Sequence, residues 1–159
     1  MSHNATPADA VRFAYELKAL VPALNAALTE VFHPIGLSCV QADALMALDE
    51  LQPITLRGLS GHLVAESGHP SRLIARLESM GLVERAPAPG DRRAALLSLT
   101  TDGAQKAAEA RAAREPVARR LAEEFGSVLP GLIDALSGIR RELDGSPDAA
   151  DRAGEVRQT

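Results

Sequence analysis

The sequence pattern over residues 53–100 restricts the possible folds of this chain more than any other segment does. "PITLRGLSGHLV" predicts a short helix with Thr55 as its cap. "AESGHPSRLIARLESMG" predicts a second helix that Ser67 caps, that has Pro70 in its first turn and that Gly81 ends. Two apolar arms, "LVERAPA" and "ALLSLT", then flank a turn rich in proline and glycine and predict a hairpin. Two short helices followed at once by a hairpin make a winged helix-turn-helix.

Longer helical patterns precede this segment. Apolar residues at helical spacing predict a helix over 8–33, which Pro22 should kink or break because proline removes a backbone donor. A second helix over 39–51 should begin at a capping box made by Ser38 and Gln41. The chain is therefore expected to be mostly α, with a small β-hairpin wing.

The pattern becomes helical again after the hairpin. An Ala-rich helix with a kink at Pro116 is followed by a helix that Ser127 should cap, and the last residues are polar and without periodicity. We expect three parts: a winged helix-turn-helix DNA-binding lobe over 37–103, a helical dimerisation region over 1–36 and 104–143, and a disordered tail over 144–159.

The outer helices carry more apolar surface than one small lobe can bury. Such a surface predicts either a partner chain or helices that cover one another within one chain, and we favour the partner chain. The residues expected at this homodimer interface are Leu17, Leu24, Leu28, Leu132, Leu136 and Ile139.

Charge is unevenly distributed. The whole chain has a net charge of −4, yet residues 53–100 hold six arginines against four acids. A local positive excess of this size predicts a contact surface rather than a general binder of polyanions.

Four segments, "LSCVQADAL", "SRLIARLESMGLVER", "DRRA" and "LSLTTDG", are specific in this order and at these distances. Over about 37–106 the chain resembles the MarR family of winged-helix transcriptional regulators. The resemblance implies a homodimer with DNA-binding lobes on a helical base. It also implies a repressor of nearby genes that releases DNA when a small, often aromatic or anionic, ligand binds between base and lobe.

The second helix of the lobe departs from the family pattern. Gly68, His69 and Pro70 stand where many members carry small hydroxyl and β-branched residues, and Ala75 stands where many carry an acid. These departures leave open which base sequence the chain reads.

A helix in the major groove presents its first turns to base edges. Arg72 can then bind a guanine edge, Ser71 a phosphate or a base, and Arg76 the DNA backbone or an acid. His69 either touches a base or packs at the turn. The preceding helix opens with Thr55 and Arg57, which contact a phosphate unless Thr55 serves only as a cap.

The turn of the hairpin holds Asp91, Arg92 and Arg93. Arginine enters a narrow minor groove because the negative potential is enhanced there, although adjacent arginines in a turn can also serve solubility alone. We expect Asp91 to brace the turn and Arg93, or else Arg92, to reach the groove. The expected DNA-contacting set is Thr55, Arg57, Ser67, His69, Ser71, Arg72, Arg76, Asp91, Arg92 and Arg93. Because one weakly basic lobe supplies few phosphate contacts, the partner should be a pseudo-palindromic site on double-stranded DNA that a dimer binds.

The residues that sense a signal are less clearly marked. Cys39 starts a helix, where a thiol can become reactive, but it can equally be a small packing residue. A small organic ligand could lie in a crevice formed by Phe13, Tyr15, Phe32, His33 and Met46, which are otherwise ordinary core and surface residues. The four histidines lack metal-ligand spacing, so we expect neither a metal nor a cofactor.

Other classes of protein fit less well. No catalytic triad, metal cluster or phosphate-binding glycine loop is present, which argues against an enzyme. There is no signal peptide or long apolar run, and a single cysteine suits a reducing compartment, so we expect a cytoplasmic protein without a membrane partner. The alternative is a winged-helix protein-interaction module without DNA binding, which would have no reason to keep Arg72, Arg92 and Arg93 together.

Overall fold

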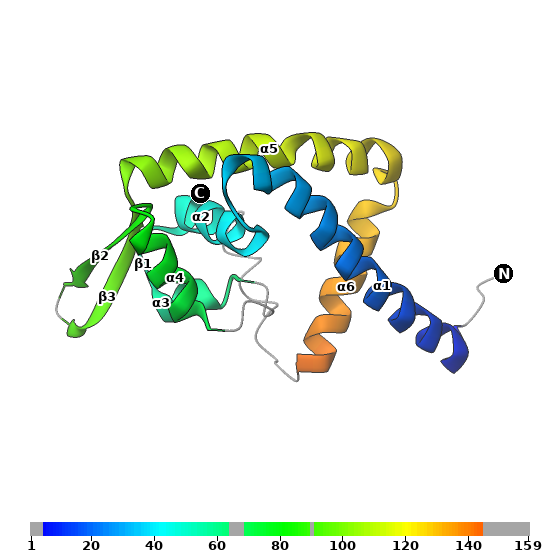
Figure 1. Ribbon diagram of the computed structural model, residues 1–159. Coiled ribbons are helices and arrows are strands. Elements are labelled where there is room, and N and C mark those ends of the chain that lie inside the picture. Colours follow the sequence, from blue (N-terminus) through cyan, green and yellow to red (C-terminus); the bar gives the residue numbers. More distant parts are fainter. Residues whose placement is uncertain (1–4, 64–68, 90, 145–159) are drawn as a thin grey trace. The chain divides into compact units, whose positions relative to one another are not determined.

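The chain is mostly helical, with a three-stranded antiparallel sheet (Figure 1). This computed structural model describes residues 5–63, 69–89 and 91–144. The elements in order are α1 (Pro7–Phe32), η1 (His33–Ile35), α2 (Cys39–Leu51), β1 (Ile54–Thr55), α3 (Leu56–Ser60), α4 (Pro70–Ser79), β2 (Val83–Ala88), β3 (Asp91–Leu99), α5 (Thr101–Phe125) and α6 (Leu129–Asp144). The chain forms two compact units, the first ending at Glu115 and the second beginning at Pro116. The tail expected to be disordered lies, after residue 144, outside the described residues.

The first two α-helices both begin at a capping box, of which only the one at α2 was predicted. A capping box of Thr6 and Asp9 opens α1. In α2, the Ser38 backbone N–H donates to Gln41 Oε1 at 2.9 Å, which confirms the predicted capping box. Of the two outcomes predicted at Pro22, a kink or a break, the break is not found, because α1 continues through Pro22 as one helix. Proline removes only one backbone donor, and the turns on both sides keep theirs.

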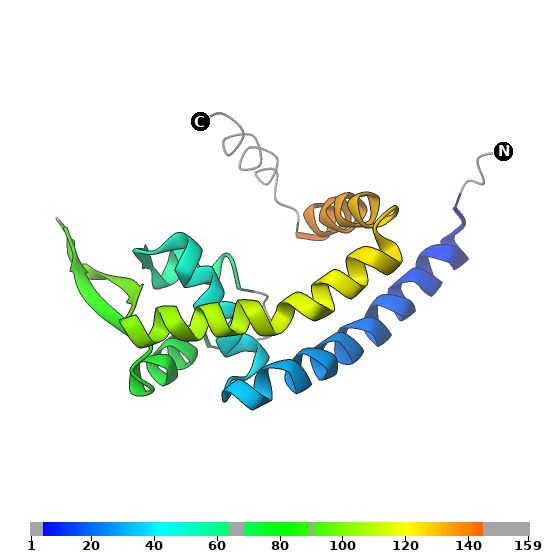
Figure 2. The same ribbon diagram turned by 90° about the horizontal axis from the view of Figure 1, so that it is seen from above.

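The sheet has the strand order β1-β3-β2. The predicted hairpin is confirmed, since Val83 pairs with Leu99 and the ladder continues to Ala88 and Asp91. In both views the hairpin extends from the lobe as a two-stranded arm (Figure 2). β1 was not predicted, because a strand of two residues is too short to show periodicity.

The turn between α4 and β2 is fixed by backbone hydrogen bonds. Gly81 has φ +73°, a conformation that favours glycine. The Leu82 N–H donates to the Leu77 carbonyl at 3.0 Å, and the Gly81 N–H donates to the Glu78 carbonyl at 2.9 Å. This is a Schellman ending, as the glycine predicted, and it turns the chain directly into the wing.

The start of α5 is locked onto this turn. Thr100 Oγ1 donates to the Gly81 carbonyl at 2.6 Å and accepts from the Gly103 N–H at 3.0 Å. A Cβ on Gly103 would lie 1.8 Å from the carbonyl oxygen of Leu82, so no larger residue fits without movement. The glycine of "LTTDG" is therefore required by close backbone packing.

A single apolar core holds the first unit together. The largest fully buried side chains come from α1, α2, α3, α4 and β3 and are Phe32, Leu45, Leu48, Leu59, Ile74, Leu77 and Leu97. Burial of these side chains is the main stabilising contribution to the lobe. Because α3 and α4 both place residues in this core, their outer faces are held rigidly.

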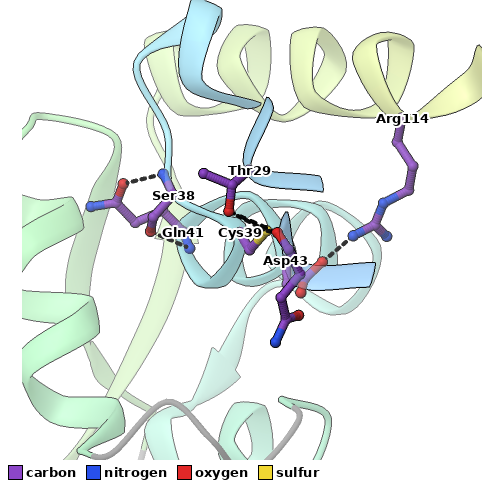
Figure 3. Close-up of polar contacts among 7 residues, drawn as sticks. Thr29, Ser38, Cys39, Gln41, Asp43 and Arg114 are labelled. Carbon is purple, nitrogen blue, oxygen red and sulfur yellow. Dashed lines mark hydrogen bonds and ion pairs between the residues drawn. The ribbon is translucent and has the colours of Figure 1, made fainter. Parts of the chain in front are cut away.

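Ion pairs fasten α5 to α2. Arg111 Nη1 lies 2.9 Å from Asp49 Oδ2, and Arg111 Nη2 lies 3.6 Å from Glu50 Oε1. Arg114 pairs with Asp43 (Figure 3), and its guanidinium lies 5.6 Å from the ring centre of Phe32. Two arginines of α5 therefore offset two of the three negative charges on α2.

The second unit contains α6. The helix begins at Leu129, so Val128 directly precedes it instead of Ser127, which we expected as the cap. α5 passes through Pro116 as one helix, and the division between the two units falls immediately before that proline.

The described helices were also compared with the length and hydropathy that a membrane span requires. No single one of them meets both requirements. Only Pro7–Ile35 and Cys39–Leu51 taken together do so, and they are bent by 75°, with five residues of α2 buried in the core.

Candidate nucleic-acid interface

α4 has one buried face and one exposed face. Ile74 and Leu77 are fully buried, whereas Arg72 and Arg76 are exposed. Residues four apart lie on the same side of a helix, so the two guanidinium groups extend from one stripe. Neither arginine forms an ion pair with another described residue, and the helix can present both to a negatively charged ligand.

The start of α4 has an unusual backbone. His69 occupies the capping position with φ 128° and ψ 89°, a conformation that residues other than glycine rarely adopt. Its side chain is exposed and makes no capping hydrogen bond, and Pro70 is the first helical residue. Ser67, which we expected as the cap, lies outside the described residues. Ser71 is exposed beside Arg72 in the first turn.

α3 begins beside the sheet. Thr55 Oγ1 accepts a hydrogen bond from the Gly58 N–H at 3.1 Å, so this hydroxyl caps the helix as predicted. Arg57 is exposed in the first turn, where backbone N–H groups also favour an anion. A Cβ on Gly58 would lie 2.8 Å from Ile54 Cγ1, which shows how closely α3 packs against β1.

The wing tip carries the remaining predicted contacts. Asp91 begins β3 opposite Ala88, and Arg92 and Arg93 follow it along the strand. The ladder shifts register between Pro87 and Ala88, which marks an irregularity near the tip. The side chains of Asp91, Arg92 and Arg93 lie outside the described part of the chain, so the bracing role of Asp91 stays a prediction.

One basic residue of the segment has a partner that the sequence did not reveal. Arg85 Nε donates to Glu78 Oε1 at 2.7 Å and so links β2 to α4. The positive excess of the lobe therefore resides in its other arginines. The sequence predicts this pair only if Gly81 is first recognised as the end of α4, because the turn at Gly81 brings β2 back past that helix.

The five residues expected to line a ligand crevice are not gathered in one place. Phe32 is fully buried and Met46 is 8% exposed, both in the core, whereas Phe13 and Tyr15 are exposed on α1. Phe13 lies about 28 Å along the helix from Phe32, given a rise of about 1.5 Å per residue. His33 is exposed at the start of η1.

Cys39 is the first residue of α2 and is half-buried. Its Sγ lies 3.8 Å from Thr29 Oγ1 and donates to the Asn25 carbonyl at 3.7 Å (Figure 3). These contacts with α1 suit a packing role. Within the described ranges, no group of three or more histidine, cysteine or acidic residues is placed to bind a metal ion.

The predicted dimerisation residues lie at or near the surface of their own unit. Leu24 on α1 is 41% exposed, and Leu132 on α6 is 47% exposed. Leu136 and Ile139 are also exposed, Leu17 is half-buried, and Leu28 packs in part against the core. Further large apolar residues are exposed, including Val11 and Leu20 of α1, Val128 directly before α6, and Ile133 of α6.

Comparison with known proteins connects this architecture to one family. The MarR family model matches residues 37–95. The organic hydroperoxide resistance transcriptional regulator of Bacillus subtilis (strain 168) is 29% identical over 100 residues, 60% of this chain and 68% of that protein. The multiple antibiotic resistance protein MarR of Escherichia coli (strain K12) is 35% identical over 77 residues, 48% of this chain and 54% of that protein.

Solved structures share the fold. The transcriptional repressor CouR bound to a 23-mer DNA duplex has a TM-score of 0.75 at 24% identity, covering 88% of this chain and 100% of that one. CouR from Rhodococcus jostii RHA1 bound to p-coumaroyl-CoA has a TM-score of 0.69 at 25% identity, covering 80% of this chain and 90% of that one. The likeness therefore extends beyond the lobe to the outer helices.

Proposed function

Because the chain belongs to the MarR family of winged-helix, DNA-binding transcriptional regulators, we propose that it is a repressor that binds its operator as a homodimer and leaves it when a small organic ligand binds. The chain is a regulator and not an enzyme. It would act in the cytoplasm. The observation that carries the proposal is the exposed arginine stripe on α4, which sits directly before the wing.

DNA recognition would use two elements of one lobe. α4 would enter the major groove, where Arg72 can donate two hydrogen bonds to a guanine edge and Ser71 can reach a phosphate or a base. Arg76 would contact the DNA backbone. His69 and Arg57 would lie close to the same strands, and Thr55 would serve mainly as the cap of α3.

The wing would reach the neighbouring minor groove. Arg93, and less strongly Arg92, would insert there because the negative potential of a narrow minor groove favours arginine. Asp91 would brace the turn. Two contacting elements in each lobe, α4 and the wing, and two lobes in the dimer would together supply the several phosphate and base contacts that specific binding needs.

Homodimerisation would use the helical region over 1–36 and 104–143. The exposed apolar residues of α1 and α6 support this, because surfaces of this kind are rarely left open to water. A twofold dimer presents two copies of α4, and so predicts a pseudo-palindromic operator.

The ligand would be a small organic molecule. The support is the CouR structure that holds p-coumaroyl-CoA, because its fold matches this chain over the outer helices as well as the lobe. Phe13 and Tyr15 are accessible candidates for ligand contacts at one end of α1 and His33 at the other, so one small ligand would contact only one of these two groups. Phe32 and Met46 would take part only if the core opens.

Binding to DNA is tested with purified full-length protein. Fluorescence anisotropy on the gene's own upstream region, together with an unbiased selection from random duplexes, should yield a site with two related half-sites. Absence of binding in both experiments at low salt would overturn the proposal and favour a protein-interaction module. A screen of aromatic acids and their coenzyme A thioesters on the complex then tests release by a ligand.

A further inference from the structure

The contact between Glu78 and Arg85 joins the two elements that would read DNA. Arg85 Nε donates to Glu78 Oε1 at 2.7 Å. Glu78 lies in the last turn of α4, and Arg85 is the third residue of β2. One hydrogen-bonded ion pair therefore bridges the helix proposed for the major groove and the strand that leads to the wing tip.

This pair is not needed to form the turn between the two elements. The backbone of Gly81 and Leu82 already closes the end of α4, and the side chains of Leu77, Leu82 and Val83 are buried beneath it. The pair itself is partly exposed, with 38% of the Arg85 side chain and 29% of the Glu78 side chain accessible. Ion pairs in such a setting stabilise a fold only slightly.

The direction of the Arg85 side chain follows from the strand. Side chains alternate across a strand, so Arg85 shares a face with Val83, which is buried, while Glu84 is exposed on the opposite face. Arg85 pairs with Leu97 of β3, which is also buried. The Arg85 side chain therefore lies over α4, and its contact with Glu78 fixes the base of the wing against the helix.

A small movement at this base becomes a larger one at the tip. Three residues of β2 follow Arg85 before the turn, a reach of about 10 Å at about 3.3 Å per residue. A rotation of about 5° at the base would then displace the end of the strand by about 0.9 Å, which is enough to lengthen a hydrogen bond of about 2.9 Å beyond its normal range.

We propose that Glu78 is a positioning residue, which acts through Arg85 to hold the wing at the angle to α4 that lets both elements contact DNA together. The inference rests on the proposed function, since it assumes that α4 and the wing bind the same duplex. It adds a residue that makes no contact with DNA and carries a charge of the same sign as the phosphates.

The sign of that charge provides a sharp test. Removing an acid from a DNA-binding lobe should by itself strengthen binding to DNA. The substitution E78Q removes the charge but also weakens the bond to Arg85, and we expect the affinity for the operator to fall. The expected loss is about threefold to tenfold, as for a charged hydrogen bond that is weakened and not deleted.

Glu84 supplies the matched control. It is the next residue to Arg85, it is exposed, and it forms no ion pair with another described residue. The substitution E84Q changes the net charge of the lobe by the same amount without touching the bridge. It should leave the affinity equal to that of the unsubstituted chain or raise it.

The charge exchange E78R/R85E separates positioning from direct DNA contact. It restores an ion pair between the same positions, so we expect it to recover at least half of the loss in binding free energy caused by E78Q. If Arg85 instead bound a phosphate itself, a glutamate at position 85 would repel DNA and the exchange would bind more weakly than E78Q. That result would overturn the proposal.

Affinity is measured by fluorescence anisotropy on the selected operator, and thermal unfolding is followed by circular dichroism. Unfolding midpoints for E78Q within about 3 °C of the unsubstituted chain are expected. If E78Q and E84Q bind equally well, or if E78Q unfolds at a much lower temperature, the positioning role is wrong while DNA binding itself stands. If the unsubstituted chain binds no duplex, the proposed function fails first.

Discussion

Arg72 shows what a single side chain contributes to the interface. Its side chain projects from the exposed face of α4, whereas Ile74 and Leu77 on the opposite face are buried in the core. A change at Arg72 therefore alters the surface and leaves the packing in place. Effects on DNA binding at this position can be assigned to the lost guanidinium.

We expect Arg72→Ala to weaken binding to the selected operator by about 1–3 kcal/mol and to relax preference at one base position in each half-site. The physical reason is the loss of a bidentate contact to a base edge. Anisotropy on the operator and on single-base variants measures both effects. Arg12→Ala, an exposed arginine of α1, is the control, and an equal loss there would show that net charge alone governs binding.

Gly103 is constrained by its backbone neighbour. We expect Gly103→Ala to destabilise the chain by about 1–3 kcal/mol, because the new methyl group would collide with the Leu82 carbonyl and force the start of α5 away from the turn.

Gly131→Ala in α6 is the matched control. A Cβ there meets nothing within 4 Å, and alanine favours a helix by about 0.5–1 kcal/mol over glycine. Urea unfolding of both variants checks the contrast. Equal midpoints would mean that α5 can shift without cost.

Among the elements, the wing is the one whose proposed role in DNA binding is inferred mainly from its sequence. The hairpin has a defined register, and Arg92 and Arg93 lie near the start of β3. At the base of the wing Val83 and Leu97 are buried in the core, whereas the following residues of β2, 85–87, are exposed. Its contribution to binding can therefore be tested separately from folding.

Arg93→Ala should weaken operator binding strongly while the dimer and the unfolding temperature stay nearly unchanged. The slope of log affinity against log salt should fall in magnitude by about one for each lost phosphate-like contact. Salt titrations by anisotropy measure this slope. An unchanged slope and affinity would show that the wing does not touch DNA.

The first turn of α1 should respond to acid. Hydrogen bonds from Thr6 lower the pKa of Asp9 below its usual value of 3.8, so the carboxylate supports the helix start above that pH. This support should be lost as the pH falls through the lowered pKa. The NMR chemical shifts of the first-turn amides, measured as a function of pH, should change with a midpoint at the lowered pKa of Asp9. In Asp9→Asn the same signals should not titrate; titration in that variant would assign the change to another group.

Much of the lobe could be predicted from sequence, because its signals are local. Ser38 with Gln41 marked the start of α2, and Gly81 marked the end of α4. The pairing of β1 with β3 could not be predicted, because it joins segments that only the folded chain brings together. Arg85 and Glu78 are close in sequence, but their pairing depends on the turn at Gly81, which brings β2 back past α4.

Site prediction shows the same division. The exposed face of α4 follows from helical spacing, since buried and exposed residues alternate there as the period requires. The five residues predicted to line a ligand crevice do not lie together, because aromatic residues occur both in the core and at the surface. Phe32 and Phe13 share one helix, yet the first is buried and the second exposed.

For the whole molecule, the exposed apolar residues of α1 and α6 are the feature that supports the proposed dimer. Leu132, Leu136 and Ile139 recur at helical spacing on α6 and are all exposed within one chain. A transcriptional regulator that binds two half-sites needs a fixed distance between two copies of α4. The dimer would supply that distance.

We expect Leu136→Glu to convert the dimer to a monomer and to lower operator affinity by at least about tenfold, since a charged side chain cannot be buried without a partner. Size-exclusion chromatography with light scattering measures the mass. Arg141→Gln makes the same change in net charge elsewhere on α6 and should remain dimeric. A dimeric Leu136→Glu variant would exclude this part of α6 from the interface.

The pairing of the α2 acids with Arg111 and Arg114 has a kinetic consequence. A chain with net negative charge should approach a polyanion slowly, because long-range repulsion acts before any contact forms. Asp43, Asp49 and Glu50 pair with two arginines, so two of their three negative charges are offset close to the lobe. The repulsion that an arriving duplex meets at this part of the lobe is therefore smaller than the acids alone would produce, and the exposed arginines of α4 can guide the approach.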